Sequence, residues 1–217
     1  PILANVYLHY VLDLWFEKCI KKQLCGKAYL VRFADDFLIM FQYERDAQRV
    51  YEAIIRRMEL FGLELSKEKT RILPFGRNCG TRETFDFLGF THFNSKTRKG
   101  YYSVGHKISR KKKKQFKSNL KKWVKENRTT QFDEFMKTLN KKLTGSFNYY
   151  SLSGMIKEVR NLWHHSLLLT FKWMNRRSQR RSFKLERFCE IWNDRIIHPY
   201  IHVDIWSGDK VIYIKNV

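Results

Sequence analysis

Two adjacent carboxylates between two apolar runs constrain this chain more than any other feature. Residues 33–36 read Phe-Ala-Asp-Asp, and the runs 28–31 and 37–41 on either side are largely apolar. The pattern predicts a buried β-hairpin with Asp35 and Asp36 at its tip. Taking anions out of water is unfavourable unless cations or donors compensate, so one interpretation is a divalent-metal site for phosphoryl transfer. The other is an Asp-rich turn without metal, because Asp hydrogen-bonds its own backbone.

Net charge divides the chain into unequal parts. The 217 residues include 43 Lys and Arg against 21 Asp and Glu, a formal charge of +22. Residues 101–199 hold 24 basic and 7 acidic side chains, whereas residues 1–100 hold 17 and 12. Such an excess repels itself and is typical of proteins that bind a polyanion. With 43% hydrophobic residues, the chain is expected to be globular.

Cysteines and apolar runs exclude other classes. The four cysteines form no CxxC pair, so neither a zinc ribbon nor a disulfide framework is indicated, and a reducing compartment is expected. No apolar run approaches the ~20 residues of a membrane span. The first residue is Pro1 rather than Met, so the lack of a targeting peptide is uninformative.

Apolar spacing predicts an α+β organisation in the first hundred residues. Residues 2–22 and 44–61 carry apolar side chains three and four positions apart and are expected to be helices, the second ending at Gly62. Its acidic residues Glu44, Asp46 and Glu52 are expected on the solvent side. Further strands are expected at 63–65, 70–75, 84–93 and 100–104, with residues 94–100 as a connecting loop.

From about residue 106 the pattern is purely helical. Ser109 and Thr130 are suitable N-caps for two helices, and two more are expected at 154–175 and 183–193, before Pro199. This change coincides with the shift in charge. Three parts are therefore predicted: residues 1–105, a basic helical module at 106–199, and an extension at 200–217 that closes as a small hairpin.

An ordered series of motifs identifies a resemblance. The chain contains, in order, PILANVYLHYVLD, FADD, GLELSKEKT and FDFLGF, and then a basic helical module with LTGSFNYY and WMNRRSQRRSF. This order resembles the reverse transcriptases of bacterial group II introns over nearly the whole chain. The resemblance implies a partial polymerase palm, an antiparallel sheet with two helices, followed by an all-α thumb bundle also called domain X. One departure is Phe33, where the family usually has Tyr.

The resemblance also implies a catalytic role for three residues. Asp35 is similar to the essential metal-ligating carboxylate, and Asp36 to its neighbour, which assists one metal or only shapes the turn. Two Mg²⁺ ions would activate the primer 3′-hydroxyl and neutralise the leaving pyrophosphate. Lys69 resembles the basic residue that approaches the triphosphate and protonates pyrophosphate; the alternative is a solvated lysine at the end of a strand.

Two further groups of residues resemble parts of the polymerase site. Phe87, Leu88, Gly89 and Phe90 look like the primer grip, where glycine lets the backbone approach the primer closely; an ordinary bulged core strand is compatible with that role. The nucleotide and template vicinity would include Pro1, Asn5, Phe33 and Ala34. Asn5 could equally cap local backbone.

Basic clusters predict the RNA-binding surface. No acidic residue lies between Lys107 and Lys125, and a merely solvated helix face normally mixes signs. The first predicted cluster comprises Lys107, Arg110, Lys111, Lys112, Lys113, Lys114, Lys117, Lys121 and Lys122. The second comprises Arg176, Arg177, Arg180 and Arg181, whose planar side chains suit phosphates and unpaired bases.

The family's further carboxylate and its fingers are expected before Pro1, so the fragment alone is expected to bind RNA without extending a primer. Expected partners are structured intron RNA, a template–primer duplex and deoxynucleotides, in the bacterial cytoplasm, with a homodimer left open. Two alternatives remain: a non-catalytic RNA-binding maturase remnant, and a related reverse transcriptase recruited to another role such as antiviral defence.

Overall fold

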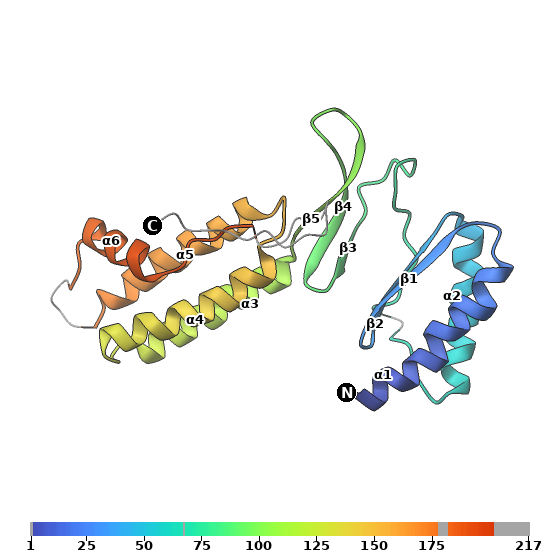
Figure 1. Ribbon diagram of the computed structural model, residues 1–217, viewed down its shortest axis with the longest axis horizontal. Coiled ribbons are helices and arrows are strands. Elements are labelled where there is room, and N and C mark those ends of the chain that lie inside the picture. Colours follow the sequence, from blue (N-terminus) through green and yellow to red (C-terminus); the bar gives the residue numbers. More distant parts are fainter. Residues whose placement is uncertain (1, 67, 178–181, 202–217) are drawn as a thin grey trace. The chain divides into compact units, whose positions relative to one another are not determined.

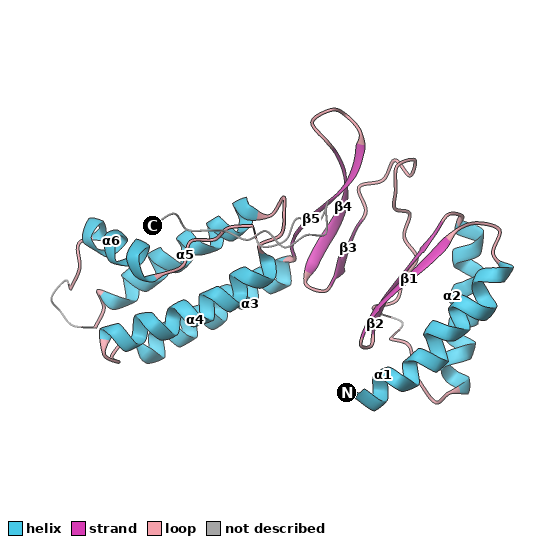
Figure 2. Ribbon diagram, in the orientation of Figure 1, coloured by secondary structure: helices cyan, strands magenta, loops and turns pink. Residues whose placement is uncertain are grey.

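A computed structural model of the protein describes residues 2–66, 68–177 and 182–201. The chain forms two compact units, Pro1–Leu88 with Phe93–Val104 and Gly89–His92 with Gly105–Val217. Figure 2 shows helices together with small antiparallel sheets, which confirms the predicted α+β class. The predicted hairpin at 200–217 lies almost wholly outside the described residues.

The first unit is built on the predicted hairpin. Strands β1 (Ala28–Phe33) and β2 (Asp36–Phe41) pair antiparallel in a two-stranded sheet, and α2 (Glu44–Leu60) follows (Figure 1). Strand alternation sends one set of side chains toward the helices. The core of this unit comprises Val11, Leu12, Phe16, Ala28, Val50, Ile54 and Met58, with Leu30, Ile39 and Phe41 packed against it.

Helix α2 ends as its sequence predicts. Gly62 has a φ of 67°, which is the left-handed conformation that glycine adopts without a Cβ clash. Its amide donates to the Glu59 carbonyl at 3.0 Å, and the Leu63 amide donates to the Met58 carbonyl at 2.9 Å. These two bonds define a Schellman motif.

One prediction about α2 is wrong. Asp46 lies not on the solvent side but inside, with only 1% of its surface exposed. Its Oδ2 accepts a hydrogen bond from the Gly26 amide at 3.0 Å. An acidic side chain in the first turn of a helix is favoured by the helix dipole, so Asp46 ties the turn before β1 to the start of α2.

The first predicted helix is present but winds irregularly. The helical run comprises α1 (Ile2–Leu8), two π-helical segments η1 (His9–Leu14) and η2 (Phe16–Ile20), and a 3-10 turn η3 (Lys21–Gln23). Apolar spacing alone does not distinguish a π-helix from an α-helix over so short a stretch. Val11, Leu12 and Phe16 nevertheless face the core, as the spacing indicated.

The strands after α2 differ from the prediction. No strand forms over the described residues of 61–83, so those expected at 63–65 and 70–75 are wrong. The strand expected at 84–93 is two strands, β3 (Thr84–Phe87) and β4 (Phe90–Lys96), joined by a tight turn at Leu88 and Gly89. With β5 (Tyr102–Ile108) they form a sheet in the order β3-β4-β5.

The second unit is a helical bundle. Its helices are α3 (Arg110–Asn127), α4 (Phe132–Tyr150), α5 (Ile156–Met174) and α6 (Leu185–Arg195), and Figure 1 shows α3, α4 and α5 lying lengthwise along one another. Their apolar stripes form one core that includes Leu120, Phe135, Leu139, Trp163 and Trp192. None of the helices in the described residues has the length and hydropathy needed to cross a membrane.

Helix starts in this unit follow the capping rules only in part. Ser109 caps α3 as predicted, because its side chain accepts from the Lys112 amide at 3.4 Å. Thr130 does not cap α4; the N-cap is Gln131, whose side chain makes no capping bond. Helix α6 ends at Arg195, four positions before Pro199, so that proline does not terminate it.

Candidate active site and nucleic-acid interface

The hairpin tip presents both carboxylates to solvent. Phe33 pairs with Asp36, so Ala34 and Asp35 form a two-residue turn. Ala34 has a φ of 54°, a conformation that L-residues adopt at a cost of roughly 1–2 kcal/mol. Asp35 and Asp36 are exposed, not buried as predicted, because they lie beyond the part of the hairpin that packs on α2. Neither carboxylate has an ionic partner in the described part of the chain.

Arg32 connects this turn to the first helical run by hydrogen bonds. Its Nε and Nη2 donate to the two carboxylate oxygens of Asp13 at 2.8 and 2.7 Å. Its Nη1 donates to Asn5 Oδ1 at 3.0 Å and to the carbonyl oxygen of Ala34 at 2.8 Å. One guanidinium therefore joins the first helical run to the strained residue that precedes Asp35.

Arg32 and Asp13 each stabilise the charged form of the other. Hydrogen bonding to Arg32 lowers the pKa of Asp13, outweighing the opposite effect of burial, and a further bond to His9 acts in the same direction. Donation to the Asp13 carboxylate likewise raises the pKa of Arg32. With only 13% of the Arg32 side chain and 25% of the Asp13 side chain exposed, the pair is partly shielded from solvent screening.

Sequence reasoning missed Arg32 and Asp13. Arg32 occupies an inward position of β1, in alternation with Ala28 and Leu30. A charged residue at an inward strand position requires a partner, and this signal could have indicated the pair.

The other residues predicted near the nucleotide lie in the same unit. Asn5 accepts from Arg32 rather than capping local backbone. Phe33 and Ala34 are exposed at the hairpin tip, and Pro1 lies outside the described residues. Lys69 is exposed, with its amide donating to the Ser66 carbonyl at 3.0 Å. Within the described part of the chain, its side chain forms no ion pair with Asp35 or Asp36.

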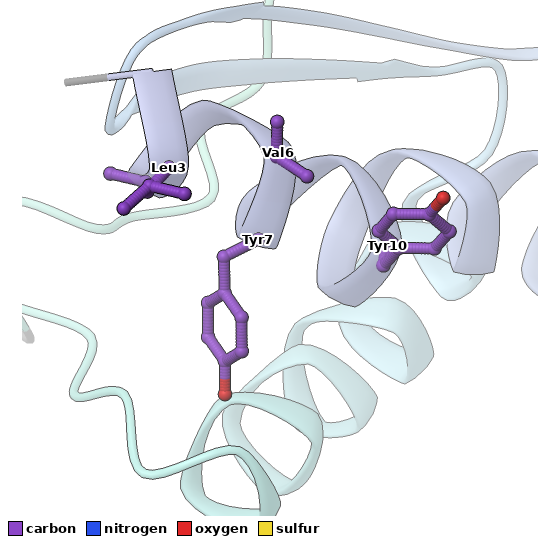
Figure 3. Close-up of a pocket in the computed structure, with 5 residues that line it drawn as sticks. Leu3, Val6, Tyr7 and Tyr10 are labelled. Carbon is purple, nitrogen blue, oxygen red and sulfur yellow. The ribbon is translucent and has the colours of Figure 1, made fainter.

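The first helical run also has an exposed apolar surface. Figure 3 shows Leu3, Val6, Tyr7 and Tyr10, which project from this single run. Tyr7 points toward the end of α2, where its hydroxyl donates to the Phe61 carbonyl at 2.7 Å. All the residues that line this shallow pocket belong to one helical run. The pocket is therefore an open surface rather than an enclosed cavity.

The predicted primer grip is a turn under backbone strain. Leu88 and Gly89 have φ values of 50° and 82°, the sign pattern of a type I′ hairpin turn. A leucine in this conformation is uncommon, because its Cβ makes the left-handed region unfavourable. The Gly89 carbonyl accepts from the Ser109 amide at 2.9 Å, which fixes the turn to the start of α3.

Aromatic side chains support the other side of that turn. The Phe90 ring stacks on Tyr149 at 5.5 Å and meets Tyr150 edge-on at 5.6 Å. Burial raises the pKa of Tyr150, with a smaller contribution from Tyr149. A Cβ at Gly89 would lie 3.5 Å from Lys112 and 3.6 Å from the Tyr150 hydroxyl, so space remains for a methyl group.

The predicted basic cluster is exposed along α3, with one exception. Lys113 donates to Glu158 Oε1 at 2.7 Å, and Glu158 Oε2 accepts from the Ile108 amide at 2.9 Å. Lys113 therefore connects α5 to the start of α3, and its ammonium group is already engaged in a partly exposed ion pair. Lys107 lies on β5, and the other exposed members lie on α3: Arg110, Lys111, Lys112, Lys114, Lys117, Lys121 and Lys122.

The second basic cluster is only partly described. Arg176 is exposed and lies against Trp173, whereas Arg177 is half-buried and donates to the Met174 carbonyl at 3.3 Å. Arg180 and Arg181 lie outside the described residues. The structure therefore leaves Arg176 as the accessible cation of this cluster in the described part of the chain.

The carboxylates suit a magnesium ion. Carboxylate oxygens are ligands that Mg²⁺ prefers, and Asp35 and Asp36 are exposed and unpaired in the described residues. The described residues provide no third ligand beside them, since they contain no group of three or more His, Cys, Asp and Glu side chains that could hold a metal.

Comparison with known families assigns the chain. Residues 1–92 match the family model for reverse transcriptase (RNA-dependent DNA polymerase), and residues 113–189 match that for the group II intron, maturase-specific domain. None of the curated proteins matches the chain. The first match places the chain in the reverse transcriptase class. Because the maturase-specific domain follows in the same chain, the protein belongs to the group II intron reverse transcriptase/maturase family, as the motif order predicted.

Proposed function

We propose that this chain contributes the catalytic hairpin and the RNA-binding helices of an RNA-directed DNA polymerase that also assists splicing of its intron. The observation that carries the proposal is the exposed, unpaired Asp35–Asp36 tip, held in a strained turn by Arg32, within the residues that match the reverse transcriptase model. One hydrogen bond of the Arg32 guanidinium reaches this turn, at the Ala34 carbonyl, and its other three anchor Arg32 to Asp13 and Asn5 of the first helical run.

Each residue has a role in this proposal. Asp35 and Asp36 would hold Mg²⁺, which supplies activation of a primer 3′-hydroxyl and neutralisation of the leaving pyrophosphate. Arg32 orients the turn through the Ala34 carbonyl. Lys69 Nζ would give a proton to pyrophosphate, and the Leu88–Gly89 turn would bring bare backbone to the primer. A further carboxylate from outside the described residues would complete the metal site.

Polymerisation is tested by Asp35→Asn in the complete protein. The amide keeps the shape of the side chain but loses the charge that holds the metal, so DNA synthesis should be lost while RNA affinity remains. Glu44→Gln, an exposed acid on α2, is the matched control and should retain synthesis. Primer extension within a few fold of wild type for Asp35→Asn would leave the hairpin as a turn and nothing more.

A second candidate function is RNA binding without polymerisation. It is favoured by the lack of a third metal ligand among the described residues. If the complete protein binds intron RNA but extends no primer at any Mg²⁺ concentration, this second function replaces the first. Restoration of synthesis when palm and fingers segments are supplied to the 217-residue chain, fused or in trans, would exclude it.

A further inference from the structure

The basic side chains of α3 form a continuous stripe that runs past the predicted cluster. Steps of three and four residues place them on one helix face, which is about 27 Å long at 1.5 Å per residue. The helical members before the last are all exposed. The stripe comprises Arg110, Lys114, Lys117, Lys121, Lys125 and finally Arg128, the C-cap residue of α3.

The stripe ends at a tryptophan shared by two arginines. The Arg128 guanidinium lies 5.5 Å from the centroid of Trp173, and that of Arg176 lies 5.6 Å from the same ring. Trp173 belongs to the last turn of α5 and packs on the bundle core. The indole therefore lies beside two guanidiniums from residues that follow separate helices, and the two are no more than about 11 Å apart.

Neither guanidinium has a carboxylate partner among the described residues. Other arginines of the same unit do pair with carboxylates: Arg187 pairs with Glu190 at 2.7 Å, and Arg195 pairs with Asp133. Both Arg128 and Arg176 follow helix C-termini, where a cation is favoured by the helix dipole. That effect explains a charge at each helix end, but it does not require two charges to share one ring.

We propose that Arg128, Trp173 and Arg176 form a second phosphate-binding site, which holds an RNA strand that has followed the stripe along α3. An arginine held beside an aromatic ring by a cation–π contact can still direct N–H groups to phosphate oxygens. The contact also restricts the side chain before binding, which reduces the entropy lost when the phosphate is held. This inference rests on the proposed RNA binding and extends it to Lys125, Arg128 and Trp173.

Salt-dependent binding tests the site. The complete protein is titrated with a fluorescein-labelled RNA hairpin that carries a single-stranded tail. Each lost phosphate contact reduces the slope of log K against log salt concentration by about 0.7–0.9. Arg128→Gln with Arg176→Gln should therefore reduce the slope by about 1.5 and weaken binding about tenfold or more at 0.1 M salt. The control, Arg187→Gln with Arg195→Gln, removes the same charge from paired arginines and should leave the slope unchanged.

The outcomes separate this site from the proposed function. If the two double variants give equal slopes, the Arg128–Trp173–Arg176 site is wrong. A third variant reverses Lys111, Lys112 and Lys114 to Glu. If that variant loses RNA affinity while the Arg128 and Arg176 variant does not, RNA binding by the bundle stands and only the second site fails. If neither variant changes affinity, both fail.

Fluorine NMR gives a readout that does not depend on a destabilised variant. Wild-type protein labelled with 5-fluorotryptophan is titrated with the same RNA, and Trp173→Phe identifies the Trp173 resonance. We expect that resonance to shift on binding, while that of Trp192, which is fully buried, stays in place. A Trp173 resonance that is unmoved at saturating RNA would overturn the proposal.

Discussion

Arg32 and Asp13 form a two-pronged ion pair between β1 and the first helical run, with donor–acceptor distances of 2.8 and 2.7 Å. The same guanidinium also donates to the carbonyl of Ala34, which lies between it and Asp35. The position of Asp35 and Asp36, the proposed metal-binding residues, therefore depends on the hydrogen bond from Arg32 to the Ala34 carbonyl, in which neither of the two takes part.

The variant Arg32→Lys tests whether the geometry of the guanidinium, rather than its charge, orients the turn. Lysine keeps the positive charge but has no planar fork, so it cannot hold Asp13 bidentately and also reach Ala34. We expect DNA synthesis by the complete protein to fall about tenfold to hundredfold, since small displacements of reacting groups are costly. Mn²⁺ affinity, measured by electron paramagnetic resonance, should weaken in parallel.

A thermal melt provides the control for Arg32→Lys. If the loss of synthesis only followed a loss of folded protein, lowering the assay temperature would restore it. Unchanged synthesis and unchanged Mn²⁺ affinity in a folded Arg32→Lys protein would show that the bond to Ala34 does not orient the turn.

The lowered pKa of Asp13 predicts how the first unit responds to acid. Its carboxylate is favoured in the folded state, chiefly by the hydrogen bond from Arg32. The resulting stabilisation is present above the unfolded pKa, near 3.8, and is lost as pH falls through the lower folded pKa. Asp13→Asn should therefore reduce stability at pH 7 more than at pH 3, in urea unfolding followed by circular dichroism. An equal loss of stability at both pH values would contradict this assignment.

Local chemistry explains which parts of the fold the sequence predicts. The Gly62 stop and the Ser109 cap depend on bonds within a few residues, so the sequence alone is enough to find them. Asp46 is different, because its burial depends on the Gly26 amide twenty positions earlier in the chain. Lys113 is likewise paired with Glu158, a residue 45 positions away. Periodicity and charge counts contain no information about such distant partners.

The turn at residues 88 and 89 shows the same limit for strands. Alternating apolar residues from 84 to 93 read as one strand, and glycine within it as a bulge. The structure instead reverses the chain there, with Leu88 in a conformation its type disfavours. The Ser109 amide and the ring cluster of Phe90, Tyr149 and Tyr150 provide the contacts that hold this turn.

Gly89→Ala tests whether that turn matters through its backbone. A methyl group would meet only ordinary contacts at 3.5 and 3.6 Å, so the cost comes from the φ of 82°. We expect a loss of about 1–2 kcal/mol in stability. If the backbone at Gly89 contacts the primer, KM for the template–primer duplex should rise by more than the loss of stability alone explains. Gly100→Ala has the same φ and open space around it, so it is the matched control and should leave KM unchanged.

The lysines at the start of α3 differ in accessibility, and a charge-reversal series can show it. Lys111, Lys112 and Lys114 are exposed, whereas Lys113 is bound to Glu158. Reversing the three exposed lysines to Glu should weaken RNA binding across many sequences and flatten its salt dependence, because fewer counterions are released. Lys113→Glu should instead lower the melting temperature, since it places two carboxylates together, and Lys113→Gln should alter RNA affinity little. If Lys113→Gln weakened RNA binding as much as Lys112→Gln does, with no change in melting temperature, Lys113 would belong to the RNA-binding surface after all.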